Sequence, residues 1–227
     1  MTELLAVYLE IGAKRTFAGV VDWPGWCRSA KTPDEALEAL LAYAPRYAKA
    51  VARTKLAVPQ LRKVDEFEVV EHVKGNATTE FGAPGVPPAA DERSLSDSEL
   101  KRQSALLEAC WDAFEAAWKK AAKAHAELSK GPRGGGRDLL RMWDHVLEAD
   151  LAYLGGLGSR EPRLPGSTSE VRMAAVHETA LETLAARARG KPIADPRQTK
   201  RLWLPRYFVR RSAWHALDHA WEIEDRS

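Results

Sequence analysis

Apolar and polar residues alternate along the first part of the chain. The alternation runs from Leu4 to Ile11, and it resumes from Phe17 to Trp23 after a basic turn. Pro24-Gly25 ends the second run, and shorter runs follow over 26–30 and 67–73. A period of two is that of half-buried β-strands, so the pattern predicts four strands.

A helix is predicted between the third and fourth strands. Thr32-Pro33-Asp34-Glu35 has the order of a capping box with proline at the first helical position. We expect this helix to continue to about Arg53. Together these elements predict a small α+β domain over residues 1–75, in which one helix covers one face of an antiparallel sheet.

The apolar positions follow a helical period in the second half of the chain. Capping sequences begin at Ser96 and Ser167, and Pro205 stands where a last helix would start. The pattern predicts four long helices. The first two cover 97–130 and 138–154, the third begins near 170, and the fourth runs from Pro205 to Arg226. Such helices, joined by Gly- and Pro-containing loops, are typical of an all-α four-helix bundle.

The predicted fold class is therefore a two-domain α+β protein. The sheet domain over 1–75 is followed by a Pro/Gly-rich segment over 76–94, which is expected to be a linker or an ordered crossover loop. The helical domain occupies 95–227.

Composition narrows the class of protein. The 34 basic and 32 acidic residues give a net charge of +2, so no global field favours nucleic acid or an anionic membrane. The chain has no apolar run of transmembrane length, no signal-peptide pattern and no CxxC spacing between Cys27 and Cys110. A cytoplasmic location is expected, and neither cysteine has a catalytic setting.

Two histidines stand four residues apart in the last predicted helix. His215 and His219 share one helical face, with Cβ atoms about 5–6 Å apart, so both imidazoles can reach one ion. His145, at the edge of the buried face of the second predicted helix, supplies a third nitrogen. Neutral imidazoles suit Zn²⁺ or Ni²⁺, and three protein ligands leave a position open. The alternative is that they are core or partly exposed histidines bonded to neighbouring carbonyl groups.

Other polar residues are candidates for roles beside these histidines. Glu222 lies on the ligand face and is expected to orient a ligand, to act as a general base or to be a solvated carboxylate at the helix end. Arg211 is a candidate for holding the anionic group of a substrate or thiol cofactor, or for a surface ion pair. His177 is expected to be a core residue or an accessory polar group.

Basic residues gather near the start of the last predicted helix. They lack stacking aromatic residues and a recognition motif, so no nucleic-acid partner is expected. We expect either an anion-handling rim near the histidines or a solvated face. The cluster contains Arg197, Lys200, Arg201, Arg206, Arg210 and Arg211.

The residues around these histidines resemble a known family. The segment Trp143-Asp144-His145 and the helix from Arg210 to Arg226, with its HxxxH, look like the DinB/YfiT-like metal-binding four-helix bundles. The resemblance covers about residues 95–227. It implies a divalent metal on His145, His215 and His219, and an activity such as hydrolysis or thiol-dependent S-transfer.

A second resemblance covers the sheet domain. Asp22-Trp23-Pro24-Gly25-Trp26-Cys27 followed by Thr32-Pro33-Asp34-Glu35-Ala36-Leu37 resembles the HicB-like antitoxin fold, in which an acidic-Pro-Gly turn leads into a T-x-x-E-A helix. It implies a partner-binding or ligand-binding module. An accessory domain packed on its neighbour is the alternative.

Two functional hypotheses follow. The first is a metal-dependent hydrolase or thiol S-transferase that acts on a small molecule, with a low-molecular-weight thiol as one cofactor to consider. The second is a non-catalytic interaction module, antitoxin-like or homodimeric, in which the metal is structural or vestigial. Neither hypothesis includes a membrane partner.

Overall fold

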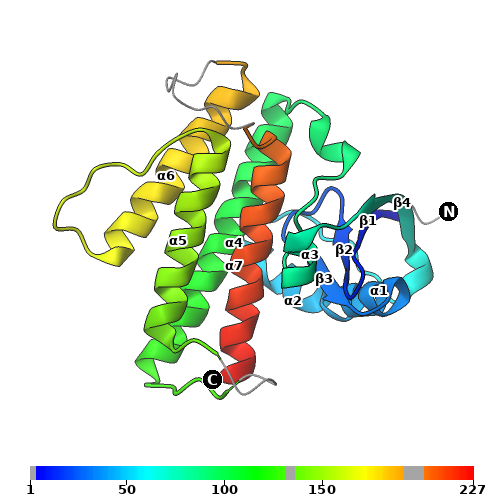
Figure 1. Cartoon of the computed structure of the whole chain (residues 1–227), viewed down its shortest axis with the longest axis horizontal. Helices are drawn as coiled ribbons and strands as arrows, with labels where there is room; N and C mark the ends of the chain where they lie inside the picture. The colour runs from blue at the N-terminus through cyan, green and yellow to red at the C-terminus, as the bar shows by residue number, and fades with distance from the viewer. Residues whose placement is uncertain (1–3, 131–135, 192–201) are drawn as a thin grey trace.

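The computed structural model describes residues 4–130, 136–191 and 202–227. It is an α+β protein in which a four-stranded sheet is followed by a helical region. Figure 1 shows the long helices on one side of the molecule and the sheet on the other. Within the described ranges, no helix combines the length and the apolar character needed to cross a membrane.

The predicted strands are confirmed with small changes at their ends. They are β1 (Leu5–Ile11), β2 (Thr16–Val20), β3 (Cys27–Ala30) and β4 (Phe67–Lys74), in the order β3-β2-β1-β4. The β1–β2 pair is antiparallel and sets Val7 opposite Val20. The β2–β3 pair is also antiparallel.

The prediction of a wholly antiparallel sheet is wrong. Strand β4 runs parallel to β1, with Leu5 opposite Phe67, so the sheet is mixed. The chain leaves the sheet at β3, crosses one face through a helical segment and returns at the opposite edge beside β1. Such a crossover delivers a parallel strand, and alternation alone does not encode strand direction.

The helix predicted after Thr32 is divided in two. Helix α1 (Pro33–Ala42) begins with the predicted capping box, whereas α2 (Ala44–Ala50) follows after Tyr43. Pro45 lies in the first turn of α2. Proline cannot donate the backbone hydrogen bond that a continuous helix would require there, so the chain restarts its helix at this point.

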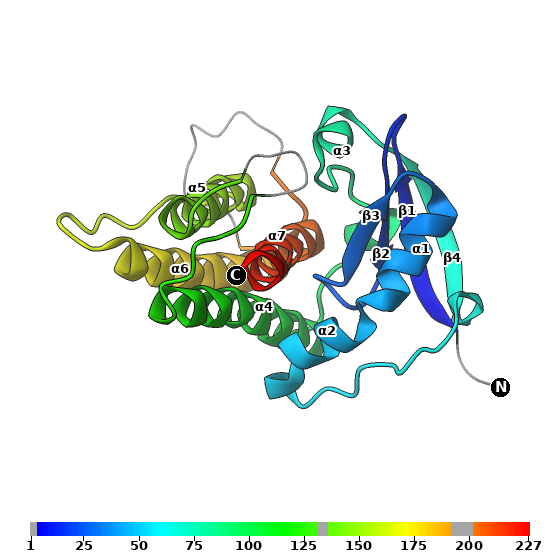
Figure 2. The same cartoon turned by 90° about the horizontal axis from the view of Figure 1, so that it is seen from below.

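Four long helices account for most of the second half. They are α4 (Asp97–Lys123), α5 (Leu139–Leu157), α6 (Ser169–Ala188) and α7 (Pro205–Arg226). Helix α7 packs along α4 and α5, and α5 packs along α6. Figures 1 and 2 show these four helices side by side. Membership of the predicted family of four-helix bundles stays a prediction.

Helix α7 lies between the other long helices and the sheet. Every residue from Arg206 to Leu217 is buried. On one side Trp111 of α4 donates a hydrogen bond to the Ser212 hydroxyl at 3.0 Å. On the other side Phe17 of β2 meets Trp214 edge to face, with ring centroids 5.9 Å apart. Figure 2 shows α7 in this intermediate position.

The segment predicted as a linker or crossover loop packs against both parts of the chain. It contains α3 (Ala77–Phe81) and a short 3-10 helix, Ala89–Glu92. The fully buried Glu10 of β1 accepts hydrogen bonds from the Thr79 hydroxyl and from the backbone N–H groups of Gly85 and Val86. A buried carboxylate thus ties this segment to the sheet.

Arg210 joins α7 to the same segment and to the sheet. Its Nη2 lies 2.7 Å from Oδ1 of Asp91, and both side chains are buried. Its Nη1 and Nη2 also donate to the carbonyl groups of Val20 and Val21, at 3.0 and 2.9 Å. One guanidinium of α7 therefore satisfies buried acceptors from two other parts of the chain.

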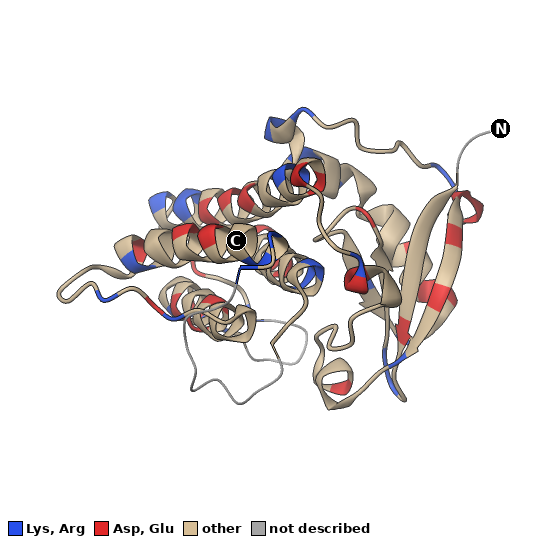
Figure 3. Ribbon diagram, turned by 90° about the horizontal axis from the view of Figure 1, so that it is seen from above, with Lys and Arg blue, Asp and Glu red and all other residues tan. Residues whose placement is uncertain are grey.

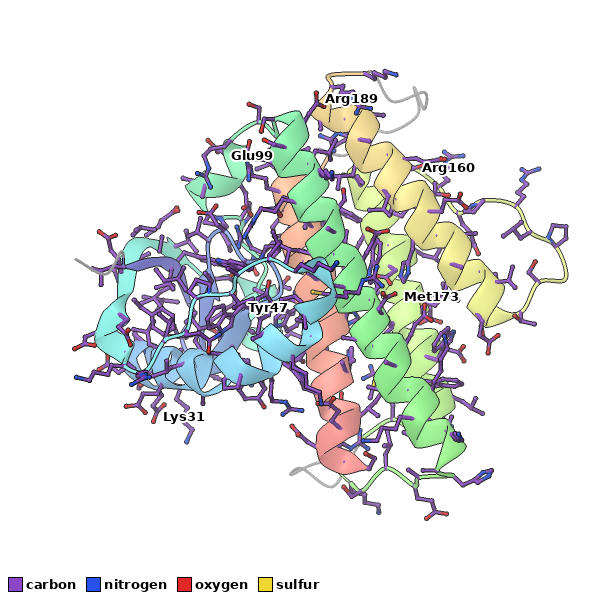
Figure 4. All side chains as sticks on the ribbon, turned by 180° about the vertical axis from the view of Figure 1, so that it is seen from behind. Lys31, Tyr47, Glu99, Arg160, Met173 and Arg189 are labelled. Atoms are coloured by element: carbon purple, nitrogen blue, oxygen red, sulfur yellow. The ribbon has the colours of Figure 1, made fainter. Side chains whose placement is uncertain are left out.

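The Pro24-Gly25 turn fits directly against the long helices. Gly25 has φ of +91°, and a Cβ at this position would lie 3.0 Å from Leu217 and 3.1 Å from the Cys110 sulfur. Tyr47 of α2 donates to the Pro24 carbonyl at 3.0 Å. Figure 4 shows Tyr47 where the sheet domain meets the long helices. Glycine is required here by both conformation and space.

We predict that Asp91→Ala lowers the free energy of unfolding by about 3–5 kcal/mol, because it leaves the Arg210 charge buried without its partner. Chemical denaturation followed by circular dichroism measures this change. The matched control is Asp22→Ala, which removes an exposed ion pair with Arg93 and should cost about 0–1 kcal/mol. Equal losses for the two variants would contradict the role given to Asp91.

Candidate metal centre

Three histidines from two helices converge. His215 and His219 lie on α7 and are 6% and 7% exposed, and His145 lies on α5 and is partly buried. The Nε2 atom of His215 is 3.3 Å from Nε2 of His145 and 3.1 Å from Nε2 of His219. The three side chains are close enough to hold one metal ion. The residues predicted as ligands are thus brought together.

Two of the three nitrogen spacings are those expected around a tetrahedral ion. With metal–nitrogen distances of about 2.0–2.1 Å, two ligands at a tetrahedral angle lie about 3.3 Å apart. The two nitrogen pairs measured here are close to that value. An all-nitrogen set of this kind suits zinc, copper, iron or nickel, so the geometry does not identify the metal.

The hydrogen bond of His219 fixes which of its nitrogens carries the proton. Nδ1 of His219 lies 2.9 Å from Oε2 of Glu222. A carboxylate only accepts, so Nδ1 carries a hydrogen, and Nε2 of the same ring faces the other histidines. A carboxylate partner on the remote nitrogen is the usual support of a metal-binding histidine.

The surroundings keep the other two rings neutral. Burial, together with the neighbouring His219 and Arg137, lowers the pKa of His145 to about 4. Burial and the adjacent imidazoles lower the pKa of His215 well below its ordinary value. Each short Nε2–Nε2 contact needs a hydrogen or a cation between the two nitrogens, because two facing lone pairs repel one another. The three histidines are therefore placed so that they could hold a metal ion.

Glu222 is held firmly in its position. Its second carboxylate oxygen accepts from Nη1 of Arg226 at 2.5 Å, and Nε of Arg226 donates to the Ser129 carbonyl at 2.7 Å. The hydrogen bond from His219 is the main cause that lowers the pKa of Glu222. This geometry favours a role in orienting His219 over that of a general base or of a solvated carboxylate.

Arg211 lies inside the protein. Its Nη1 donates to the Pro84 carbonyl at 3.0 Å, and its guanidinium lies over the rings of Tyr153 and Trp214. Within the described residues it forms no ion pair, so the expected surface ion pair is not observed. Tyr153 also packs against His215, with ring centroids 5.6 Å apart. Arg211 and Tyr153 therefore cover the side of the histidine centre that is nearest the start of α7.

The described members of the basic cluster do not form the predicted anion-handling rim. Arg206 and Arg210, like Arg211, are buried and donate to protein acceptors, including Glu99 and Asp91. The other members of the cluster, Arg197, Lys200 and Arg201, lie outside the described residues. Figure 3 shows Lys and Arg interspersed with Asp and Glu along the long helices.

A second buried polar network was not predicted from the sequence. Asp150 of α5 lies 2.9 Å from Nε2 of His177 of α6, and it accepts from the Ser212 hydroxyl at 3.3 Å. Trp111 stacks on His177, with ring centroids 3.8 Å apart. The carboxylate lies between histidine and serine, so the serine is not activated by the imidazole as in a catalytic triad. The sequence feature that could have revealed this network is Asp150, a polar residue on the apolar arc of its helix.

We predict that both cysteines react slowly with thiol reagents in the folded protein. Burial raises the pKa of Cys27 to about 12 and that of Cys110 well above its ordinary value, so neither forms the reactive thiolate near neutral pH. Titration with a chromogenic disulfide reagent should label both in denaturant and neither under native conditions. Fast native labelling of either thiol would contradict this assignment.

We also predict that Glu222→Ala weakens metal affinity by about 10–100-fold, since His219 loses the carboxylate that orients it. Competition with a chromophoric chelator measures this affinity. Glu148→Ala, at an exposed position of α5, is the matched control and should bind metal as the wild type does. An unchanged affinity in the Glu222 variant would remove Glu222 from the centre.

Comparison with protein families, with curated proteins and with solved structures finds no match to this chain. The resemblances to DinB-like and HicB-like proteins therefore remain predictions from the sequence motifs, and the centre is defined by its own geometry.

Proposed function

We propose that this protein is a metal-dependent enzyme of the DinB-like type, a hydrolase or thiol S-transferase that acts on a small molecule. The observation that carries the proposal is the convergence of three imidazoles, with the Nε2 atoms of His219 and His145 lying 3.1 and 3.3 Å from Nε2 of the central His215. We assign His145, His215 and His219 as ligands of Zn²⁺ or Ni²⁺.

The open coordination position is what makes such a site catalytic. Three protein ligands leave room for water or for a substrate atom. A bound divalent ion lowers the pKa of water to about 7 and deprotonates a coordinating thiol outright. Both cysteines of the protein are buried and do not supply a thiolate at the ion. A thiol nucleophile would therefore come from a low-molecular-weight thiol.

The protein side chains around the site have distinct tasks in this proposal. Glu222 keeps the Nε2 lone pair of His219 directed at the ion. Burial, then the two adjacent imidazoles and the positive charge of Arg211, lower the pKa of His215, which keeps that ligand ready to bind. His145 is the most exposed of the three proposed ligands.

The sheet domain has a supporting task in the same proposal. Its strand β2 and its Pro24-Gly25 turn pack on α7, the helix that carries two of the ligands. We assign to this domain the narrowing of access to the metal. The HicB-like resemblance adds a second task, the recruitment of a protein partner.

We predict that untagged protein binds about one Zn²⁺ or Ni²⁺ ion per chain, and that His215→Ala and His219→Ala abolish this binding. Elemental analysis after dialysis, together with calorimetric titration, measures the stoichiometry. His72→Ala is the control, because His72 lies exposed on β4 and its loss should leave the metal content unchanged.

Two outcomes would count against this function. Wild-type protein without stoichiometric metal would overturn it entirely. Full occupancy without turnover of ester, amide or thiol-adduct substrates would instead favour the non-catalytic module with a structural metal.

A further inference from the structure

A polar cavity of about 430 Å³ lies between the sheet and α7. This volume is within the range of small-molecule sites, about 300–1,000 Å³. Its walls come from the turn before β2, from β2 and β3, from the junction of α1 and α2, from the end of α3 and from the second half of α7. The residues that matter below are Arg15, Phe17, Arg28, Trp214, Asp218 and Glu222.

The cavity borders the proposed metal centre through α7. Glu222 lines the cavity and also holds His219 at 2.9 Å. Trp214 lines the cavity too, and its ring centroid is 6.0 Å from that of His215. At about 100° per residue, Glu222 lies on the helix between the cavity residue Asp218 and the ligand His219. A molecule in the cavity would therefore lie against Glu222 and Trp214, which contact His219 and His215.

One cation in the cavity has no carboxylate partner among the residues that are described. Arg28 pairs with Asp218 at 2.9 Å, and Arg226 pairs with Glu222 at 2.5 Å. Asp225, a third acidic residue of the wall, pairs with Arg46 outside the cavity lining. Arg15 donates only to the Ser29 hydroxyl, at 3.0 Å. Among the three arginines of the wall, Arg15 is thus the one whose guanidinium has no carboxylate partner in the described part of the chain.

We infer that this cavity binds the substrate of the metal centre, and that the substrate is a small molecule with an oxyanion group that Arg15 holds. The planar fork of an arginine matches a carboxylate or a phosphate with two parallel hydrogen bonds. Phe17 and Trp214, which are 1% and 5% exposed, form an apolar part of the cavity wall. This inference rests on the proposed function, because it names the substrate class of that site.

The sheet domain gains a specific task from this placement. Arg15, Phe17 and Arg28 all come from the strands and turns of the sheet, whereas the metal ligands come from α5 and α7. The sheet and its turns would then recognise the anionic group, and helices α5 and α7 would hold the ion.

The test is a titration of the zinc-loaded full-length protein with benzoate and with phenyl phosphate, followed by ligand-observed NMR. Benzyl alcohol is the uncharged control ligand. We expect saturable binding of at least one anion, no binding of benzyl alcohol, and an affinity at least about 10-fold weaker in Arg15→Gln. Arg15→Lys keeps the charge and should recover part of the affinity. Whichever of the two anions binds with the higher affinity indicates whether the substrate carries a carboxylate or a phosphate ester.

The matched control variant is Arg62→Gln, which removes the same charge from an exposed position away from the cavity and should bind as the wild type does. Circular dichroism of each variant establishes that it is folded. Absence of anion binding by the wild type, or equal binding by Arg15→Gln, would overturn the inference. Metal content is measured separately, so loss of zinc without loss of anion binding would refute the metal-dependent function alone.

Discussion

The burial of α7 on two sides is the constraint on which the rest of the structure depends. This helix has apolar groups over most of its circumference, so it is stable only when other elements surround it. Helices α4 and α5 cover one side, and the sheet with its adjoining segment covers the other. The Arg210–Asp91 pair fixes that second contact, because a buried guanidinium requires its carboxylate and carbonyl partners.

The same burial prepares the histidine centre. An imidazole on an exposed helix would be solvated and free to protonate, whereas His215 is nearly enclosed and its pKa is strongly lowered by that burial. The Glu222 bond then fixes the ring of His219. The proposed metal site is thus a consequence of packing, and the polar cavity beside it arises where the sheet meets the same helix.

Sequence patterns predicted most of the local structure. Alternation located the strands, and the capping box at Thr32 located α1, because hydrophobic period and capping chemistry are local properties. The predicted direction of β4 was wrong, because strand direction depends on the path that the chain takes between strands. The break at Tyr43 was missed although Pro45 signalled it.

The sequence by itself determined that His215 and His219 share a helical face, because a four-residue spacing fixes their relative position whatever surrounds them. Only the tertiary structure decided that His145 approaches them and that Arg210 and Arg211 turn inward rather than toward solvent. It also placed Arg15 of the sheet beside α7. These outcomes join residues far apart in the chain, and such contacts depend on how whole elements pack.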